Sequence, residues 1–397
     1  MAVKNIIGKP VAGANFFGRE HELNDLKRIT EEEHVLLLAP RRVGKTSLLL
    51  ALQAETNKTD GTSGSYVSVA AARDERHFVE LVLDSIYATG AGAKLRPNRM
   101  GSWLQRKGRQ IRGVKVGAAG ATAGIDLHSG GDGWQEDANR AIVSILRSDL
   151  QWLILIDELP TLVLTIARLD PSGQRVRAFL QWFRDLRQLP AALGKLRFVL
   201  AGSVGLDSVT RRHLLTHTIN DLRDWRLGPY DTTVADHFLK ELAGAYQVDL
   251  GAELRREICD HAEWLIPYHL QVIFSALREC SGGRTPSKTH LKQAIEALLA
   301  RKTYFNSWVE RLREALGTPE DKFARLVLAT CASDPRGATR SSLSQSLMVQ
   351  IPDLAKRNTT LTWLLDVLLN DGYLVEHQGR WRFRSGLLRR YWERHVR

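Results

Sequence analysis

The chain has 397 residues and a mass of 44.6 kDa, and 44% of its residues are hydrophobic, which is enough to bury a large core in two or three domains. It has no run of 18 apolar residues, its start lacks the form of a signal peptide, and Cys259, Cys280 and Cys331 have neither metal-ligand nor disulfide spacing. These features exclude a helical membrane protein and a disulfide scaffold, and they lead us to expect a cytoplasmic protein. The net charge of +12 favours anionic partners such as nucleic acid; the alternative is an arginine-rich chain without such a partner.

The first predicted elements are an apolar strand at residues 34–38, a loop, and a helix-forming run from Ser47. The loop nearly matches the phosphate-binding pattern G-x-x-x-x-G-K-[ST] and reads Ala39, Pro40, Arg41, Arg42, Val43, Gly44, Lys45, Thr46. In that layout backbone N–H groups face a polyphosphate, Lys45 reaches its outer oxygens, and the Thr46 hydroxyl ligates Mg²⁺. The motif predicts nucleotide binding; the alternative is a solvated basic turn.

Between this loop and the next clear strand, the sequence predicts an outer strand around residues 66–69 and a glycine-rich hairpin or loop at residues 113–127. Basic residues precede the glycine-rich segment, namely Arg106, Lys107, Arg109 and Arg112. A basic hairpin there could contact DNA or a neighbouring subunit, and a plain surface loop is the alternative.

Residues 152–156 form a short, fully apolar run, which indicates a buried parallel strand, and Asp157 and Glu158 follow it directly. Carboxylates at the end of a buried strand are costly unless a cation meets them, and Lys45 is the natural partner. In a P-loop ATPase the first carboxylate supports Mg²⁺ and the second polarises the attacking water. A strand that runs out into solvent is the alternative, but it leaves the pairing with Lys45 unexplained. The pair favours hydrolysis over passive binding.

A third strand at residues 196–201 ends in Gly202 and Ser203, and residues 225–227 form another plausible outer strand. Because strands alternate with helical stretches, we expect a parallel sheet with the ligand at the carboxyl ends of its strands. Ser203 is the candidate sensor of the γ-phosphate; the alternative is a helix cap. Arg211 and Arg212 are candidate arginine fingers or ordinary surface arginines, and a finger that acts in trans would require an oligomer.

The last 170 or so residues divide by pattern into a helical stretch, residues 229–316, and a mixed stretch, residues 317–397. Helices at 321–330, 340–347 and 358–369 followed by strands at 373–376 and 380–383 predict a winged helix-turn-helix. Residues 320–397 contain 13 basic and 8 acidic side chains, a net charge of +5. The candidate DNA contacts are Lys356, Arg357, Asn358, Thr359, Thr360 and Thr362 on the third helix and Arg380 on the wing. The alternative is a module that docks on the core or on a protein partner.

These motifs together resemble the archaeal-type ATPases, in the STAND and origin-initiator-like branch of AAA-related P-loop proteins. The resemblance rests on segments spread over nearly the whole chain, namely residues 16–23, 39–49, 155–158, 201–203, 266–271 and 387–392. It implies an α/β P-loop NTPase core with a parallel sheet at residues 1–228, a helical lid at 229–316 and a C-terminal winged helix-turn-helix at 317–397.

The resemblance also implies where an adenine would bind. The segment Phe17, Gly18, Arg19 and Glu20 would pack beside the base, and Pro267 with its neighbours would close over it from the lid. The family pattern favours adenine over guanine. Members of the family usually carry glycine where this chain has Ala39. The methyl group costs about 1 kcal/mol or more if that position needs a positive φ, and very little if it lies in the β region.

The sequence therefore predicts an ATP- and Mg²⁺-dependent switch that acts on or near double-stranded DNA, in a defence, transposition or replication-like role, with no membrane partner. The alternative is a STAND-type signalling scaffold whose winged helix binds protein partners, with ATP controlling assembly and no DNA contact. A homo-oligomer is compatible with both hypotheses.

Overall fold

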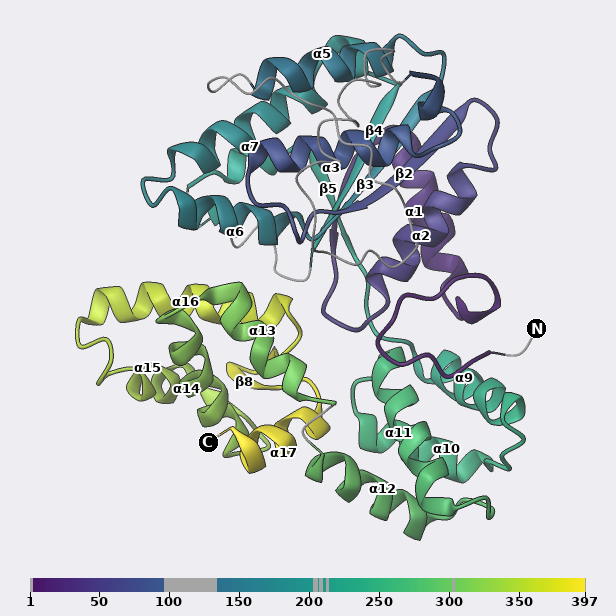
Figure 1. Ribbon diagram of the computed structural model, residues 1–397. Coiled ribbons are helices and arrows are strands. Elements are labelled where there is room, and N and C mark those ends of the chain that lie inside the picture. Colours follow the sequence, from purple (N-terminus) through teal and green to yellow (C-terminus); the bar gives the residue numbers. More distant parts are fainter. Residues whose placement is uncertain are drawn as a thin grey trace, which may run out of the picture.

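A computed structural model of the protein describes residues 3–95, 134–202, 206, 210, 211, 214–301 and 304–396 (Figure 1). The glycine-rich segment at 113–127 and the basic residues before it lie outside the described residues, so the prediction of a hairpin there is not tested. Helices α1 to α7 and a sheet form the first part of the chain, helices α9 to α12 the second, and α13 to α17 with a small sheet the third (Figure 1).

The described residues of the first part form a five-stranded parallel sheet in the order β2-β3-β4-β1-β5. The strands are β1 (His34–Leu38), β2 (Thr62–Ser68), β3 (Gln151–Asp157), β4 (Leu196–Gly202) and β5 (Leu222–Arg226). The runs of Leu, Ile and Val in β1, β3 and β4 are buried almost throughout, because helices cover both faces of the sheet. The edge strand β5 is polar and mostly exposed. The predicted strands and the parallel sheet are confirmed.

Helices pack on the two faces of this sheet (Figure 1). Helices α1 (Glu20–Glu32) and α2 (Lys45–Thr56) contact each other and one face. The other face carries α3 (Glu75–Tyr87), α5 (Trp134–Leu146), α6 (Leu159–Leu169) and α7 (Gln174–Arg187). Short 3₁₀ helices lie at Gly13–Asn15, Gly92–Leu95, Pro190–Ala192 and Thr216–Ile219. Edge-to-face aromatic contacts such as Phe78–Phe179 and Phe183–Phe198 join α3, α7 and β4 into one core.

The second part is helical throughout its described residues. Its helices are α9 (Thr232–Ala245), α10 (Ala252–Ala262), α11 (Pro267–Ser281) and α12 (Lys288–Ala300). The side chains of Asp231 and Ser287 cap α9 and α12, and Pro267 opens α11 at a position that needs no N–H donor. None of the helices in the described part of the chain is both long enough and apolar enough to cross a membrane.

The third part contains α13 (Asn306–Leu316), α14 (Glu320–Ala332), α15 (Arg340–Ser346), α16 (Leu354–Asn370) and α17 (Gly386–His395). Strands β6 (Ala338–Thr339), β7 (Leu374–His377) and β8 (Arg380–Phe383) form an antiparallel sheet in the order β6-β8-β7. The helix predicted from residue 358 begins one turn earlier, because the Asp353 side chain accepts a hydrogen bond from the Lys356 N–H and caps α16 there. Strand β6 was not predicted from the sequence.

The third part packs closely against both others. Gly372, which follows α16 and has φ of 84°, lies so close to Pro40 and Trp264 that a Cβ there would be 2.7 Å from a side-chain carbon of each. Helix α17 contacts α10 and α12. Arg211 forms an ion pair of 2.6 Å with Asp366 on α16. The end of α16 is therefore seated on the start of the phosphate loop.

Candidate functional site

The loop between β1 and α2 turns sharply before the helix begins. Gly44 caps α2 with φ of 105°, a left-handed conformation that glycine adopts without strain, and Arg42 has φ of 65°. Ala39 is buried and does not have a positive φ. Its methyl group therefore causes no backbone strain, and the departure from glycine at this position carries little energetic cost.

Lys45 meets both predicted carboxylates at the carboxyl edge of the sheet. Its Nζ lies 2.8 Å from Asp157 Oδ1 and 2.9 Å from Glu158 Oε1. The Thr46 hydroxyl donates a hydrogen bond of 2.8 Å to Asp157 Oδ2. Strand β4 separates β1 from β3, so these side chains come together only because the loop carries α2 across the end of β4. The structure thus brings together the four residues that the two motifs single out.

The charges of this cluster stabilise one another. Burial by itself lowers the pKa of Lys45, but the negative charges of Glu158 and Asp157 more than offset it, so the pKa is raised and Lys45 stays charged. Tyr66 on β2 donates a hydrogen bond of 3.4 Å to Asp157 Oδ2. Burial and the charge of Asp157 raise the pKa of Tyr66 above its usual range, so the phenol keeps its proton. Tyr66 was not identified from the sequence, because only the sheet places it beside Asp157.

Glu158 is held in an unusual backbone conformation. Its φ of 64° is left-handed, which costs a residue with a side chain roughly 1 kcal/mol or more. Its N–H donates to Asp157 Oδ1 at 2.9 Å, and its Oε2 accepts a hydrogen bond of 3.2 Å from the Thr161 hydroxyl. The turn directs the carboxylate toward Lys45 and leaves it partly exposed in the cavity described next.

A cavity of about 390 Å³ lies over the loop. All residues from Pro40 to Ser47 line it, and so do Phe17, Arg19, Glu158 and Pro267, as the sequence predicted. Gly18 was also predicted there, but it does not line the cavity. The volume is within the range of small-molecule sites, and the donors at its base suit a polyphosphate. Two oxygen ligands, from Thr46 and Asp157, lie 2.8 Å apart at the same place, which fits a magnesium ion.

The N-terminal segment forms a wall of the cavity that sequence reasoning missed. The Val11 N–H donates to Ser47 Oγ at 3.0 Å, and Arg42 donates to the Gly8 carbonyl at 3.2 Å. The segment has no periodicity and no motif, so nothing in its sequence points to this position. Tyr268, a neighbour of Pro267, also lines the cavity, and the other lining residues that were not predicted are Ile6, Lys9, Pro10, Asn15, Phe16, Tyr230, Phe238 and Gln271.

Arg19 connects the loop to the chain that leads into the lid helices. It donates to the Gly228 carbonyl at 2.7 Å and to the Val43 carbonyl at 3.4 Å, and its guanidinium lies 4.5 Å from the Tyr230 ring. Tyr230 in turn donates to the Phe17 carbonyl at 2.8 Å. These contacts make Arg19 a buried support of the cavity wall, in addition to lining it.

The other candidates for catalysis are not brought to this cavity within the described residues. Ser203 and Arg212 lie outside the part of the chain that the structure describes. Arg211 is paired with Asp366, and it does not line the cavity. Among the lid residues beside Pro267, His269 on α11 is buried, with its pKa lowered to about 4 by burial, and it does not line the cavity.

The candidate DNA contacts on α16 divide into exposed and buried residues. Lys356, Asn358, Thr359 and Thr362 are exposed and Thr360 is half-buried. Arg357 is buried, and it donates hydrogen bonds of 2.7 Å and 2.9 Å to the carbonyls of Ile351 and Pro352. The prediction that Arg357 contacts DNA is therefore wrong, because its guanidinium anchors the chain that enters α16.

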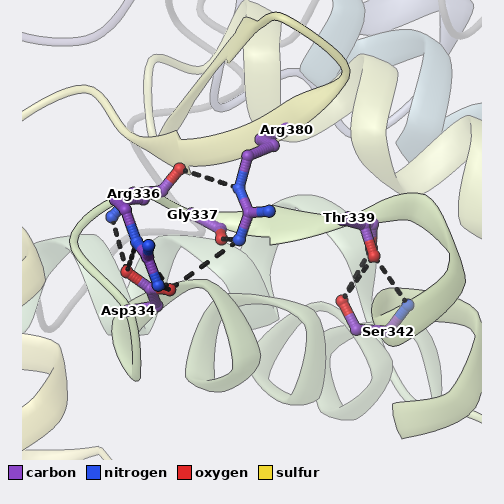
Figure 2. A network of polar contacts seen from close by, with 6 residues as sticks. All are labelled: Asp334, Arg336, Gly337, Thr339, Ser342 and Arg380. Atoms are coloured by element: carbon purple, nitrogen blue, oxygen red, sulfur yellow. Dashed lines mark hydrogen bonds and ion pairs between the residues drawn. The ribbon is translucent and has the colours of Figure 1, made fainter.

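Arg380 on β8 is held in the same way, although part of it is exposed. Figure 2 shows its guanidinium directed at the turn before β6, where it donates to the carbonyls of Gly337 at 2.7 Å and Arg336 at 3.3 Å. Asp334 lies 3.7 Å away and also pairs with Arg336. Beside this network, Thr339 caps α15 through the Ser342 N–H (Figure 2). Arg380 fixes the hairpin to β6, and this role competes with contact to a phosphate.

No family model matches the chain, and no curated protein sequence matches it. Among solved structures, a Walker-type ATPase of Pyrococcus abyssi is similar, with 17% identity over 97% of this chain and 98% of the other and a TM-score of 0.62. The Aeropyrum pernix ORC2 protein has 12% identity over 98% and 95% of the two chains and a TM-score of 0.49. The Thermotoga maritima RuvB Holliday junction branch migration motor has 14% identity over 94% of each chain and a TM-score of 0.42. The first likeness shows the fold, which is that of a P-loop NTPase.

Proposed function

We propose that this protein binds and hydrolyses ATP in a Mg²⁺-dependent reaction and works as a molecular switch coupled to DNA or to a DNA-associated complex. The observation that carries the ATPase part is the cluster of Lys45, Asp157 and Glu158 beside a cavity that the phosphate loop lines from Pro40 onward. The likeness of the fold to a Walker-type ATPase supports the same reading.

The residues at the loop have distinct roles in this proposal. Lys45 exchanges its carboxylate partners for phosphate oxygens, which are equally strong acceptors of charge-assisted hydrogen bonds. Thr46 and Asp157 hold Mg²⁺, which when bound neutralises phosphate charge. The Gly44 turn and the start of α2 supply N–H donors that need no reorganisation.

Glu158 orients the attacking water and accepts its proton. In the structure its two oxygens are occupied by Lys45 and Thr161. When Lys45 turns to the phosphates, Oε1 loses that partner and can accept a hydrogen bond from water, while the Thr161 contact keeps the carboxylate in place. Ser203, as γ-phosphate sensor, and Arg211 or Arg212, as arginine finger, remain parts of the proposal that the described residues do not test.

An adenine base fits the upper part of the cavity in this proposal. Phe17, Tyr230, Phe238 and Tyr268 give it apolar and aromatic walls, and Pro267 stands at the start of the lid helix α11. Stacking on aromatic faces favours a purine. The preference for adenine over guanine rests on the resemblance noted from the sequence.

The coupling to DNA rests on the third part of the chain. The order helix, strand, helix, helix and hairpin is typical of a winged helix, and we retain the three-domain division at residues 228 and 316 as part of the proposal. The exposed face of α16 presents Lys356, Asn358 and Thr359, side chains that suit phosphates and base edges. The net charge of +5 over residues 320–397 supports an anionic partner.

A second candidate function, the protein-binding signalling scaffold, is favoured by one specific observation. Met348, Val349 and Leu354, in and beside the connection between α15 and α16, are 50%, 81% and 60% exposed. Large apolar side chains grouped on a surface are more typical of a protein interface than of DNA contact. This group borders the same end of α16 as Lys356, so both partners would use one surface.

Steady-state ATP turnover with and without double-stranded DNA tests the proposal, with the Glu158→Gln variant as control. Stimulation by DNA that disappears at high salt supports coupling to DNA, since phosphate contacts weaken steeply with salt. Turnover that DNA leaves unchanged would favour the scaffold. Absence of turnover in the wild-type protein under both conditions would contradict the ATPase itself.

A further inference from the structure

A second cavity of about 250 Å³ lies at the carboxyl edge of the sheet, on the other side of Pro40 from the first. Three neighbouring strands end at the same level there, because Leu38 of β1 is in register with Gly202 of β4 and with Arg226 of β5. The third part of the chain closes the cavity with the end of α16 and with Arg384. The cavity therefore lies between the sheet and the C-terminal region.

The charged side chains among the described lining residues are Arg226 and Arg384, and no carboxylate lines the cavity among them. The Arg226 side chain is exposed to solvent and has no ion pair or hydrogen bond within the described part of the chain. Arg384 donates from Nε and Nη2 to the Leu374 carbonyl at 3.4 Å and 3.3 Å, and its Nη1 has no acceptor among the described residues. Asp371, the acidic residue nearest in sequence to the lining residues of α16, is buried and does not line the cavity.

Arg226 and Arg384 face one cavity, and no carboxylate lines it among the residues that the structure describes, so the two like charges repel each other. Burial, and then the charge of Arg226, lower the pKa of Arg384, and arginine nevertheless stays charged in proteins. The Trp264 ring lies 5.4 Å from the Arg384 guanidinium and holds it in place. An anion with several oxygens removes the repulsion and accepts hydrogen bonds from both groups, and phosphate matches the planar fork of arginine best.

We propose that this second cavity is a phosphate-binding site, formed by Arg226 and Arg384 and separate from the nucleotide cavity. Its ligand is inorganic phosphate or the phosphate group of a small molecule. The site joins the edge of the sheet to the C-terminal region, so its occupancy stabilises the contact between them. It does not depend on ATP hydrolysis and goes beyond the proposed function.

Titration of the full chain with inorganic phosphate, followed by tryptophan fluorescence and by calorimetry, tests the site, because Trp264 lies against Arg384. We expect saturable binding that weakens roughly tenfold or more in Arg226→Gln, since a charge-assisted contact is lost. Arg226 has no partner in the described chain, so this variant should fold normally. Arg147→Gln, which removes an exposed charge at the end of α5, is the matched control and should bind as the wild type does.

The same titration in a Lys45→Gln background separates the two cavities. Binding that still depends on Arg226 in that background supports a separate site, even if the protein hydrolyses no ATP. Binding that Arg226→Gln leaves unchanged, or the absence of saturable binding at millimolar phosphate, would overturn the proposal. Arg384→Gln gives a second, independent measure, and its melting temperature shows whether the loss of its contacts to Leu374 and Trp264 has affected the fold.

The phosphate could belong to the bound nucleotide or come from free solution. Adding ATP to the Glu158→Gln variant, which we expect to bind ATP without rapid turnover, distinguishes these two sources. If ATP competes with inorganic phosphate and Arg226→Gln also weakens ATP binding, the terminal phosphate of the nucleotide reaches the site. If ATP leaves phosphate affinity unchanged, the ligand comes from free solution. The first result retains a phosphate contact at Arg226 and Arg384 but overturns the separation of this site from the nucleotide cavity, whereas the second supports both parts of the proposal.

Discussion

Buried charges are arranged differently at the phosphate loop and at the C-terminal helix α16. At the loop, Lys45 is paired with the carboxylates of Asp157 and Glu158, at the base of a cavity that a ligand can enter. At α16, Arg357 donates to the backbone carbonyls of Ile351 and Pro352 in the turn before the helix. A phosphate can replace the partners of Lys45, whereas replacing those of Arg357 would undo the local fold. A basic residue within a sequence motif, such as Lys45, is thus a better guide to ligand contact than one, such as Arg357, that is chosen only from its position in a predicted helix.

The largest expected effect is that of Lys45→Ala on nucleotide binding. The variant loses the charge that meets the phosphates, and ATP binding should fall below detection in a calorimetric titration. Lys240→Ala, which removes an exposed lysine on α9, is a suitable control. If Lys45→Ala binds ATP as tightly as the wild type, Lys45 is not a ligand contact, and the distinction between the phosphate loop and α16 fails.

Glu158→Gln should retain ATP binding and lose at least ~100-fold in turnover, because the amide cannot accept a proton from water. The substitution keeps the size of the side chain and its hydrogen bond from Thr161. Binding by calorimetry and turnover by phosphate release measure the two effects separately. Unchanged turnover would exclude Glu158 as the base.

Arg357→Ala should destabilise the protein by roughly 2–3 kcal/mol, since the carbonyls of Ile351 and Pro352 lose a charged donor. The free energy of unfolding in urea gives this value. If the variant is as stable as the wild type and binds DNA less tightly, Arg357 is a DNA contact and our correction fails.

Lys356→Ala provides the matched comparison on the same helix. Lys356 is exposed, so its loss should leave stability within about 0.5 kcal/mol of the wild type. If α16 binds DNA, affinity should fall and the salt dependence of binding should lose roughly one unit of slope. A filter-binding series over salt concentration gives both numbers, and an unchanged slope would favour the protein-binding scaffold.

The smallest expected effect is that of Ala39→Gly. Because Ala39 has no positive φ, glycine relieves no strain, and ATP affinity should stay within about twofold of the wild type. Stability should fall by roughly 0.5–1 kcal/mol, since glycine loses more conformational freedom on folding. A gain in affinity of tenfold would show that the methyl group obstructs the loop.

Much of the first part could be predicted because its signals are local. The run His34–Leu38, the loop to Thr46 and the pair Asp157–Glu158 lie where the sequence places them. Helix α16 begins one turn before the start that the sequence pattern predicts, because the Asp353 side chain caps it. No sequence pattern indicates the burial of Arg357 or the position of residues 6–11 over the cavity. Both depend on tertiary contacts, and residues 6–11 also have no periodicity.

The amino-acid sequence by itself determined the parallel sheet, the phosphate loop and the meeting of Lys45 with two carboxylates. A strand–loop–helix motif is compatible with few backbone conformations, and burying a charge is costly unless a charge of opposite sign lies beside it. Only the tertiary structure decided which arginine side chains are bound to partners within the protein and which face a cavity. Arg357 and Arg380 are held by carbonyls, and so in part is Arg384, but Arg384 also shares with Arg226 a cavity without a carboxylate among the described residues that line it. The reason is that the availability of a charge depends on the neighbours that packing brings to it, and those neighbours come from distant parts of the chain.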